Sequence, residues 1–204
     1  RLLRSRRRKS RPSHAPERNV QSGIGSVVRQ LGLRGRLKTA YLLFFQTASP
    51  ETVERKNMRI VIAAPSNGTE LKNALKARLQ TDPRVSRLTD LSTPDGTYPQ
   101  LSFAAAQEVA AGRADRAILI CGTGVGTAIA ANKVRGIRAA TAHDLVTVRG
   151  SVENYDAQVL CMGQNVIAAP AAWALVDIWL DLRHDTSSGY APKVGEIDAF
   201  ERGA

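Results

Sequence analysis

At 204 residues with 43% hydrophobic content, the chain is long enough for one domain with a buried core, and its apolar runs, such as residues 168–174, are far shorter than the roughly 20 residues of a membrane-spanning helix. The formal net charge of +11 lies in residues 1–57, which hold 14 of the 29 Lys and Arg but only 3 of the 18 acids. Residues 58–204 hold 15 basic and 15 acidic residues and are neutral overall. The charge therefore predicts neither a nucleic-acid partner nor a membrane partner for the domain. Cys121 and Cys161 lie in separate apolar stretches of a chain without a secretory pattern, so we expect reduced thiols in a cytoplasmic protein rather than a disulfide framework.

Residues 1–57 form a basic extension that we expect to be largely disordered, with a short amphipathic helix near residues 27–45. Three interpretations remain open for it. An Arg-rich, Ser-containing and acid-poor leader is typical of mitochondrial targeting; a basic arm can contact nucleic acid; and the extension can be a dispensable leader. A recognised nucleic-acid motif is absent, which disfavours the second interpretation.

The rest of the chain alternates between short apolar runs and stretches with helical periodicity. We expect strands at residues 58–64, 85–91, 117–121, 137–142 and 158–162, and helices at residues 69–79, 99–111, 127–133, 145–152 and 168–182, followed by a partly helical tail. Because apolar strands that alternate with helices form parallel sheets covered on both faces, the pattern predicts a three-layer, doubly wound α/β domain over residues 58–204. The spacing fits the flavodoxin-like strand order 2-1-3-4-5.

In that order, the loops after the first and third strands meet at the crevice where doubly wound sheets bind ligands. Ser66 and Asn67 from the first loop are therefore candidate substrate-binding residues. In the second loop, Gly122, Gly124 and Gly126 let the backbone approach a ligand closely, and the helix that follows directs unpaired N–H groups toward an anion.

Two nucleotide-binding motifs can be tested against this turn. A dinucleotide fingerprint requires Gly where the chain has Thr127, and the Lys-Ser or Lys-Thr pair of a P-loop is missing. The turn therefore predicts a site for a small phosphorylated substrate and no nucleotide cofactor.

Cys121 ends the third strand, directly before the turn, where its side chain can enter the crevice. The amino end of the next helix favours thiolate, which makes Cys121 a candidate base or nucleophile. The alternative is a buried structural cysteine, which is what we expect of Cys161. The Thr123 hydroxyl can donate or relay a proton, or simply bond the backbone.

Three basic side chains are further candidates for the substrate site. His143 follows the fourth strand, where it can titrate near the ligand, although it can equally be a bystander beside a helix cap formed by Asp144. Arg183 and Lys193 can supply positive charge to a phosphate across a dimer interface, or they can simply be solvated surface residues.

The turn Cys121–Gly126, followed by Ala-Ala-Asn-Lys at 130–133 and Gly-Ile-Arg-Ala at 136–139, resembles the ribose-5-phosphate isomerase B and galactose-6-phosphate isomerase family. Tyr98-Pro99 and Gly163 occur in the corresponding order, and the resemblance covers about residues 58–197. It implies a flavodoxin-like fold, no cofactor and no metal, and homodimers or tetramers whose active sites combine residues of two subunits.

The resemblance also implies the reaction, an aldose–ketose interconversion of a sugar phosphate through a cis-enediolate. Cys121 would move the proton between C1 and C2, Thr123 would assist at the oxygens, and the N–H groups of residues 122–126, Val125 included, would stabilise the enediolate. Tyr98 and Asn132 would line the substrate site.

Several positions depart from the family pattern. Pro65-Ser66 replaces an Asp-His pair, Asn154 stands where the family has a ring-opening His, and a pair of phosphate-binding Arg is reduced to Lys193, with Gly189 at the other position. Loss of the ring-opening residue favours an open-chain substrate, such as a tetrulose phosphate, over ribose 5-phosphate. The alternative is a non-catalytic sugar-phosphate binding or regulatory module of the same fold.

Overall fold

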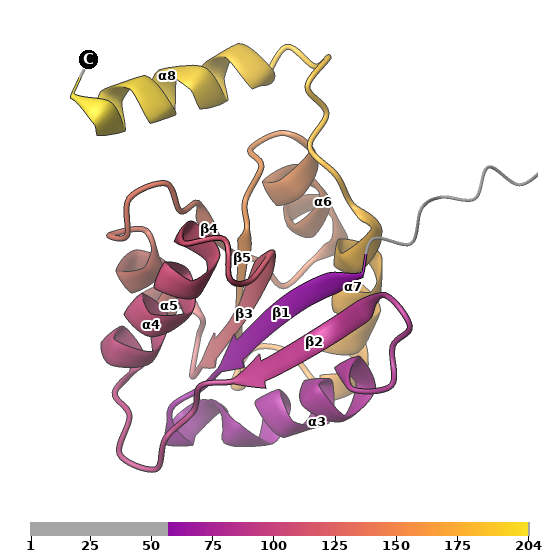
Figure 1. Cartoon of the computed structure of the whole chain (residues 1–204). Coiled ribbons are helices and arrows are strands. Elements are labelled where there is room, and N and C mark those ends of the chain that lie inside the picture. Colours follow the sequence, from indigo (N-terminus) through magenta and orange to yellow (C-terminus); the bar gives the residue numbers. More distant parts are fainter. Residues whose placement is uncertain (1–56, 204) are drawn as a thin grey trace, which may run out of the picture. The chain divides into compact units, whose positions relative to one another are not determined.

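The computed structural model describes residues 57–203 (Figure 1). The basic extension, apart from Asn57, and the helix expected near residues 27–45 lie outside the described residues. The elements in chain order are β1 (Met58–Ala63), η1 (Ser66–Gly68), α3 (Thr69–Leu79), β2 (Val85–Asp90), α4 (Tyr98–Ala110), β3 (Arg116–Cys121), α5 (Val125–Ala131), β4 (Ala139–Thr141), α6 (Leu145–Glu153), β5 (Val159–Gly163), α7 (Ala169–Asp181) and α8 (Ala191–Arg202). The strands and helices expected between residues 58 and 182 are confirmed, with ends within two residues of those expected, and the partly helical tail contains α8. Within residues 57–203, no helix combines the length and apolar character needed to span a bilayer.

The strands form one five-stranded parallel sheet in the order β2-β1-β3-β5-β4. The α/β fold with a parallel sheet is confirmed, but the expected order 2-1-3-4-5 is wrong for the last two strands. β5 is buried along its whole length and pairs with β3, whereas the three residues of β4 are half-buried and occupy the edge. The physical reason is that an apolar strand gains most from burial on both faces, while a short strand of small residues loses little at an edge.

Helices cover both faces of the sheet (Figure 1). Helices α3, α6 and α7 pack on one face against side chains such as Ile62 and Ile118, with the fully buried Trp179 among them. Helices α4 and α5 pack on the other face against Val61 and Leu119. Because successive residues of a strand point to opposite faces, these apolar runs supply two cores, and the doubly wound architecture is confirmed.

Helix α8 lies apart from these layers (Figure 1) and is held to the loop between α5 and β4 by polar contacts. Glu201 accepts hydrogen bonds from the amide of Gly136 to its Oε2, at 2.7 Å, and from Arg135 to its carbonyl oxygen, at 2.6 Å. Asp198 pairs with Arg138 at 2.8 Å. Ile197 and Phe200 of α8 remain exposed, whereas Val194 is the buried residue of the helix.

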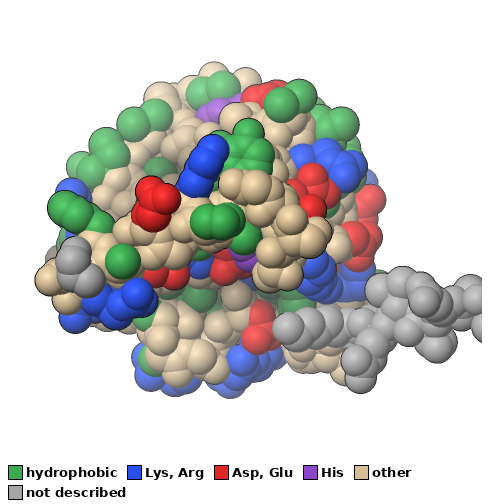
Figure 2. All heavy atoms as spheres, turned by 90° about the horizontal axis from the view of Figure 1, so that it is seen from above, with side chains coloured by type: hydrophobic (Ala, Val, Ile, Leu, Met, Phe, Trp, Pro, Cys, Tyr) green, Lys and Arg blue, Asp and Glu red, His purple; other side chains and the backbone are tan. Residues whose placement is uncertain are grey.

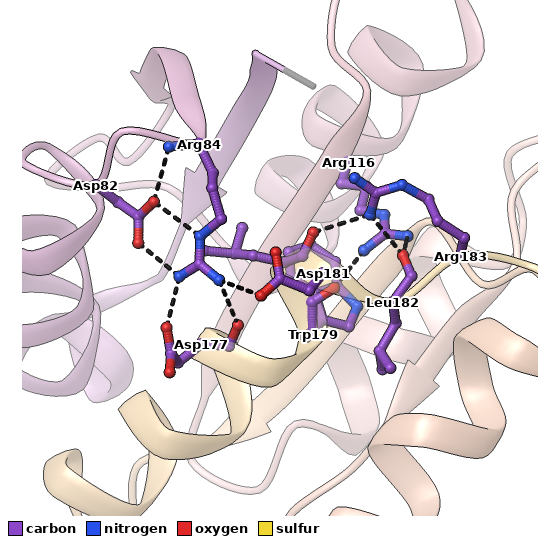
Figure 3. Close-up of polar contacts among 9 residues, drawn as sticks. Asp82, Arg84, Arg116, Asp177, Trp179, Asp181, Leu182 and Arg183 are labelled. Carbon is purple, nitrogen blue, oxygen red and sulfur yellow. Dashed lines mark hydrogen bonds and ion pairs between the residues drawn. The ribbon is translucent and has the colours of Figure 1, made fainter. Parts of the chain in front are cut away.

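Arg116, at the start of β3, fastens the carboxyl end of α7 to the sheet (Figure 3). Its guanidinium donates to the carbonyl oxygens of Trp179, at 2.5 Å, and Leu182, at 2.7 Å, and lies 4.9 Å from the centre of the Trp179 ring. Burial, with a smaller effect of the neighbouring Arg183, lowers the pKa of Arg116 to about 10. Positive charge at this place satisfies carbonyls that the helix end leaves without partners.

A second arginine, Arg84, ties the start of β2 to the same helix (Figure 3). It donates to the carboxylates of Asp82, at 2.7 Å, and of Asp177 and Asp181, at 2.5 and 2.7 Å. The Arg84 side chain is 18% exposed, so these hydrogen bonds are partly shielded from solvent.

Replacing Arg84 with Ala should lower the free energy of unfolding by about 1 to 3 kcal/mol, because it removes several charge-assisted hydrogen bonds that join β2 to α7. Urea denaturation followed by circular dichroism measures this loss. Arg113→Ala is the matched control, since the Arg113 side chain is 58% exposed and forms a surface ion pair with Glu108. Equal losses in the two variants would contradict the role given to Arg84.

Candidate active site

The turn that follows β3 requires glycine at its centre. Gly124 has a φ of 80° and a ψ of −16°, the left-handed conformation that residues with a Cβ rarely adopt, and it precedes α5 as its N-cap. A Cβ at Gly124 would also meet the backbone of Met162 in β5 at 3.0 to 3.1 Å. The turn therefore needs glycine both for its shape and for its contact with β5.

Gly163, the last residue of β5, presses against the same turn. A Cβ at Gly163 would lie 2.5 Å from the Cα of Thr123, a distance that no side chain can occupy. The next amide, of Gln164, donates to the carbonyl of Cys121 at 2.8 Å. The end of β5 and the turn thus pack backbone against backbone.

The Cys121 thiol lies beneath this turn, next to a backbone amide and a hydroxyl. The amide of Gly124 donates to Sγ at 3.1 Å, and the Thr127 hydroxyl lies 3.8 Å from Sγ. Burial raises the pKa of Cys121, but the amides of Thr123 and Gly124, together with Thr127, outweigh it and lower the pKa below that of an ordinary thiol. The arrangement favours the thiolate, the form that can act as a base.

Cys161 shows what the same side chain does without the backbone amides of the turn. It is fully buried in the core between the sheet and helices α4 and α5, and burial raises its pKa to about 12. Cys161 is therefore a structural residue, as expected.

A cleft of about 680 Å³ opens beside the turn, between the loop after β1 and the start of α4. Ser66, Asn67 and Tyr98 line it. The Tyr98 ring covers Gly126, because a Cβ at Gly126 would lie 2.9 Å from the ring carbon Cε2. Three of the expected substrate-binding residues therefore lie in a cleft that borders the glycine turn.

Two carboxamides approach each other across Gly122. Nδ2 of Asn67 and Nδ2 of Asn165 each lie 3.3 Å from the point where a Cβ on Gly122 would be, so Gly122 leaves a space flanked by amide donors. Sequence reasoning points to Asn67 but not to Asn165, because Asn165 follows β5 and the expected strand order placed β5 at the sheet edge, away from the turn.

Four other expected residues are not gathered at the turn within one chain. Asn132 lies at the far end of α5, where both atoms of its amide pair with the backbone of Ala139, at 2.7 and 2.8 Å. Asn154 ends α6, and Arg183 donates to carbonyls of the last turn of α7, so both lie toward the amino ends of the strands. Lys193 lies at the start of α8, with Nζ 4.8 Å from the centre of an aromatic ring.

His143 lies in the loop from β4 to α6, at the carboxyl ends of the strands, where the glycine turn also lies. Its Nε2 accepts a hydrogen bond from the amide of Gly163 at 2.8 Å. Asp144 caps α6 by accepting from the amide of Thr147 at 2.9 Å, so the capping interpretation of Asp144 is confirmed. Burial lowers the pKa of His143, and Asp144 opposes this with a smaller effect.

The described residues contain no group of three or more His, Cys, Asp or Glu side chains arranged to hold a metal ion. What the site offers instead is a thiol with a lowered pKa, backbone amides at the start of a helix, and carboxamides that border an open cleft. These groups can remove a proton from carbon and stabilise negative charge on oxygen.

Iodoacetamide should alkylate Cys121 in the folded protein with an apparent thiol pKa below the unperturbed value of about 8.5, because backbone amides stabilise the thiolate. Cys161 should react after unfolding, since it has no exposed surface whereas Cys121 is 7% exposed. Peptide mass spectrometry across a pH series measures both rates, and Cys121→Ser is the control that assigns the signal. Faster labelling of Cys161 than of Cys121 would contradict the lowered pKa.

Comparison with known proteins identifies the family. Residues 60–197 match the family model described as Ribose/Galactose Isomerase. The D-erythrulose-4-phosphate isomerase 2 of Mycolicibacterium smegmatis is 50% identical over 148 residues, covering 71% of this chain and 97% of that protein. The D-erythrulose-4-phosphate isomerase of Pectobacterium atrosepticum is 37% identical, with coverage of 71% and 95%. The structure of Clostridium thermocellum ribose-5-phosphate isomerase B is similar with a TM-score of 0.67 at 36% identity, covering 72% of this chain and 99% of that one. The chain belongs to the ribose/galactose isomerase family.

Proposed function

We propose that this protein is a cofactor-independent isomerase that interconverts the ketose and aldose forms of a four-carbon sugar phosphate. Family membership supplies the reaction class, a sugar-phosphate isomerisation. The observation that carries the mechanism is the Cys121 thiol, whose lowered pKa and position beneath the glycine turn suit it to proton transfer.

The reaction moves one proton between neighbouring carbons and needs no external oxidant or reductant. In the ketose-to-aldose direction, the Cys121 thiolate removes a proton from C1, and the electron pair forms the C1–C2 double bond as the C2 carbonyl oxygen gains negative charge. The resulting thiol returns the proton to C2, while the C1 hydroxyl loses its proton and becomes the aldehyde. The Thr123 hydroxyl passes the proton between the two oxygens.

The cis-enediolate carries its charge on oxygens that lie next to the turn. The amide of Gly126, in the first turn of α5, has no earlier helical carbonyl to bind and can donate to those oxygens, whereas the amide of Val125 donates to the Thr123 hydroxyl at 3.4 Å. Asn67 and Asn165 add side-chain amides across Gly122. Donors held in place in this way stabilise the transition state more than the substrate, because the charge develops during the reaction.

The four-carbon substrate is supported by the residue that stands where related isomerases have a ring-opening histidine. This position is Asn154, which cannot act as an acid or base at neutral pH. A four-carbon 4-phosphate needs no such residue, since the ketose has no hydroxyl that could close a five-membered ring on C2, and in the aldose the phosphate occupies the C4 oxygen that would close one on C1. Two similar proteins are named as isomerases of D-erythrulose 4-phosphate, which agrees with this choice.

The protein should isomerise D-erythrulose 4-phosphate with a higher kcat/KM than ribose 5-phosphate. Cys121→Ala should lower kcat by about 10² to 10⁴-fold, because it removes the base, and Cys161→Ala should retain turnover. A panel of tetrose, pentose and hexose phosphates measures this preference. Lack of turnover for every member would support the non-catalytic binding module, and full activity of Cys121→Ala would exclude the thiol as the base.

We propose also that the active form is a homodimer in which a second copy completes each site. An apolar groove of about 780 Å³ lies between α8, α6 and β4. Val146, Ile197 and Phe200 line it and are 83%, 51% and 85% exposed. Figure 2 views the molecule from above, the side on which α8 lies in Figure 1, and shows hydrophobic side chains at the surface among charged ones. Exposed apolar surface of this kind is typical of an interface.

A second copy is the occupant that the distribution of site residues favours. Asn154 borders this groove, and Lys193 lies near the same end of α6, because its ring partner Tyr190 contacts Tyr155 at 5.5 Å. Within one copy, the helices that carry Asn154 and Lys193 place both residues far from Cys121. In a two-fold dimer, each copy would present them to the partner's turn, where Lys193 and Arg183 would bind the phosphate.

Mixing two inactive variants tests the shared site. Cys121→Ala and Lys193→Ala should each be weakly active alone, and co-refolding them in equal amounts should restore about a quarter of wild-type activity, because half of the dimers are hybrids with one intact site of two. Enzyme assays combined with size-exclusion chromatography measure this recovery. Co-refolding Cys121→Ala with Cys121→Ser is the control and should restore nothing. Activity no greater than the sum of the separate variants would contradict a shared site.

A further inference from the structure

The observed strand order places the loop after β4 beside the carboxyl end of β5. β4 pairs with β5 from Ala139 opposite Val159 to Thr141 opposite Cys161, and the amide of Ala142 continues the ladder by donating to Cys161 at 3.1 Å. His143 is the next residue, so it meets Gly163 rather than the cleft.

Thr141 forms a hydrogen bond to the glycine turn, and His143 forms one to the end of β5, so the two residues bind the two segments that pack against each other. The Thr141 hydroxyl donates to the carbonyl of Gly124 at 3.1 Å, on the side of the turn. Nε2 of His143 accepts from the amide of Gly163 at 2.8 Å, on the side of β5. The last residue of the three-residue edge strand β4 and the loop after it thereby touch both of the glycines whose close packing shapes the site.

The hydrogen bond from Gly163 determines the chemical form of the histidine. A backbone amide can only donate, so Nε2 of His143 must present its lone pair, and the single ring proton of the neutral imidazole lies on Nδ1. Protonation of Nε2 would place its N–H against the backbone N–H of Gly163, and two donors cannot form a hydrogen bond with each other. The contact to Gly163 therefore exists only when His143 is neutral.

We propose that His143 is a positioning residue for the isomerase reaction, whose neutral imidazole holds Gly163, and through it the glycine turn and Cys121, in the reactive arrangement. Protonation of the imidazole releases Gly163 and loosens the turn. The kinetic consequence rests on the proposed function, whereas the structural link from His143 to Gly163 does not.

The charged groups around His143 allow the neutral form at neutral pH. Asp144, on the same loop, is the charge that acts on the imidazole. The charges of α6 are Arg149 and Glu153, which pair with each other at 2.7 Å farther along the helix. Strand β4 and helix α5 carry no ionisable side chain.

The ionisable groups of the neighbouring strands β5 and β3 on this side of His143 are thiols. β5 contributes Cys161, whose pKa burial raises to about 12, and the end of β3 contributes Cys121. Because burial lowers the pKa of His143 in the folded chain, the unfolded chain binds the proton more tightly. The stability from the His143–Gly163 contact is therefore fully present above the unfolded pKa and is lost as the pH falls through the folded pKa.

Two substitutions separate positioning from substrate binding. His143→Gln keeps an oxygen acceptor of similar reach without a titrating proton, and His143→Leu removes the acceptor. With D-erythrulose 4-phosphate at neutral pH, the Leu variant should lose about tenfold or more in kcat with KM changed less than about threefold, since a small misplacement of the base slows proton transfer. The Gln variant should recover most of that kcat. A raised KM in both variants, or an unchanged kcat in the Leu variant, would overturn the proposal.

A measurement without substrate keeps the proposal separate from the proposed function. In ¹⁵N-labelled protein, the amide resonance of Gly163 should shift as the pH falls below the ordinary histidine pKa of about 6.5 and His143 becomes protonated, and this shift should disappear in His143→Gln. Alkylation of Cys121 by iodoacetamide should slow in His143→Leu and not in His143→Gln. If the wild-type protein turns over no sugar phosphate, the proposed function fails while these two readouts still decide the role of His143. A Gly163 amide that does not respond to pH, or that responds equally in both proteins, would overturn it.

Discussion

Backbone contact between the glycine turn and the end of β5 is the constraint on which the rest of the site depends. Gly124 packs against the backbone of Met162 in β5, and Gly163 packs against the backbone of Thr123 in the turn, at distances that leave no room for a Cβ on either glycine. The contact fixes where the amides at the start of α5 point and keeps Sγ of Cys121 within hydrogen-bond distance of Gly124. The sheet order follows the same need, since β5 must lie beside β3 for the two backbones to meet.

The two cysteines show how strongly this contact changes the chemistry of a side chain. Cys161 lies in the core between the sheet and helices α4 and α5, whereas Cys121 ends β3 and is 7% exposed, and burial by itself disfavours the thiolate of each. Cys121 differs because the turn directs backbone amides toward its sulfur, and these outweigh burial. Reactivity at this site therefore arises from hydrogen bonding to the charged form rather than from exposure.

The residues proposed for the site are divided between the two ends of the parallel strands. Groups suited to enediolate formation lie at the carboxyl ends of β1, β3 and β5, whereas Arg183 and Asn154 lie toward the amino ends, where α6 and α7 finish. Helices that follow parallel strands run back along the sheet, so one copy cannot bring both sets together. The proposed dimer resolves this division, and it gives the exposed apolar residues of α8 a physical role.

Local patterns in the sequence were sufficient to predict the five strands, the five helices that cover the sheet, the glycine turn, the cleft residues Ser66 and Asn67, and the contrast between the two cysteines, whereas Tyr98 followed from the family resemblance. These depend on periodicity and on glycine chemistry within a few residues. The order of β4 and β5 depends on which strand gains most from burial against β3, and this is decided by long-range packing. With that order unknown, neither Asn165 beside Gly122 nor the bond from Gly163 to His143 could be derived, because each joins segments that only the folded sheet makes neighbours.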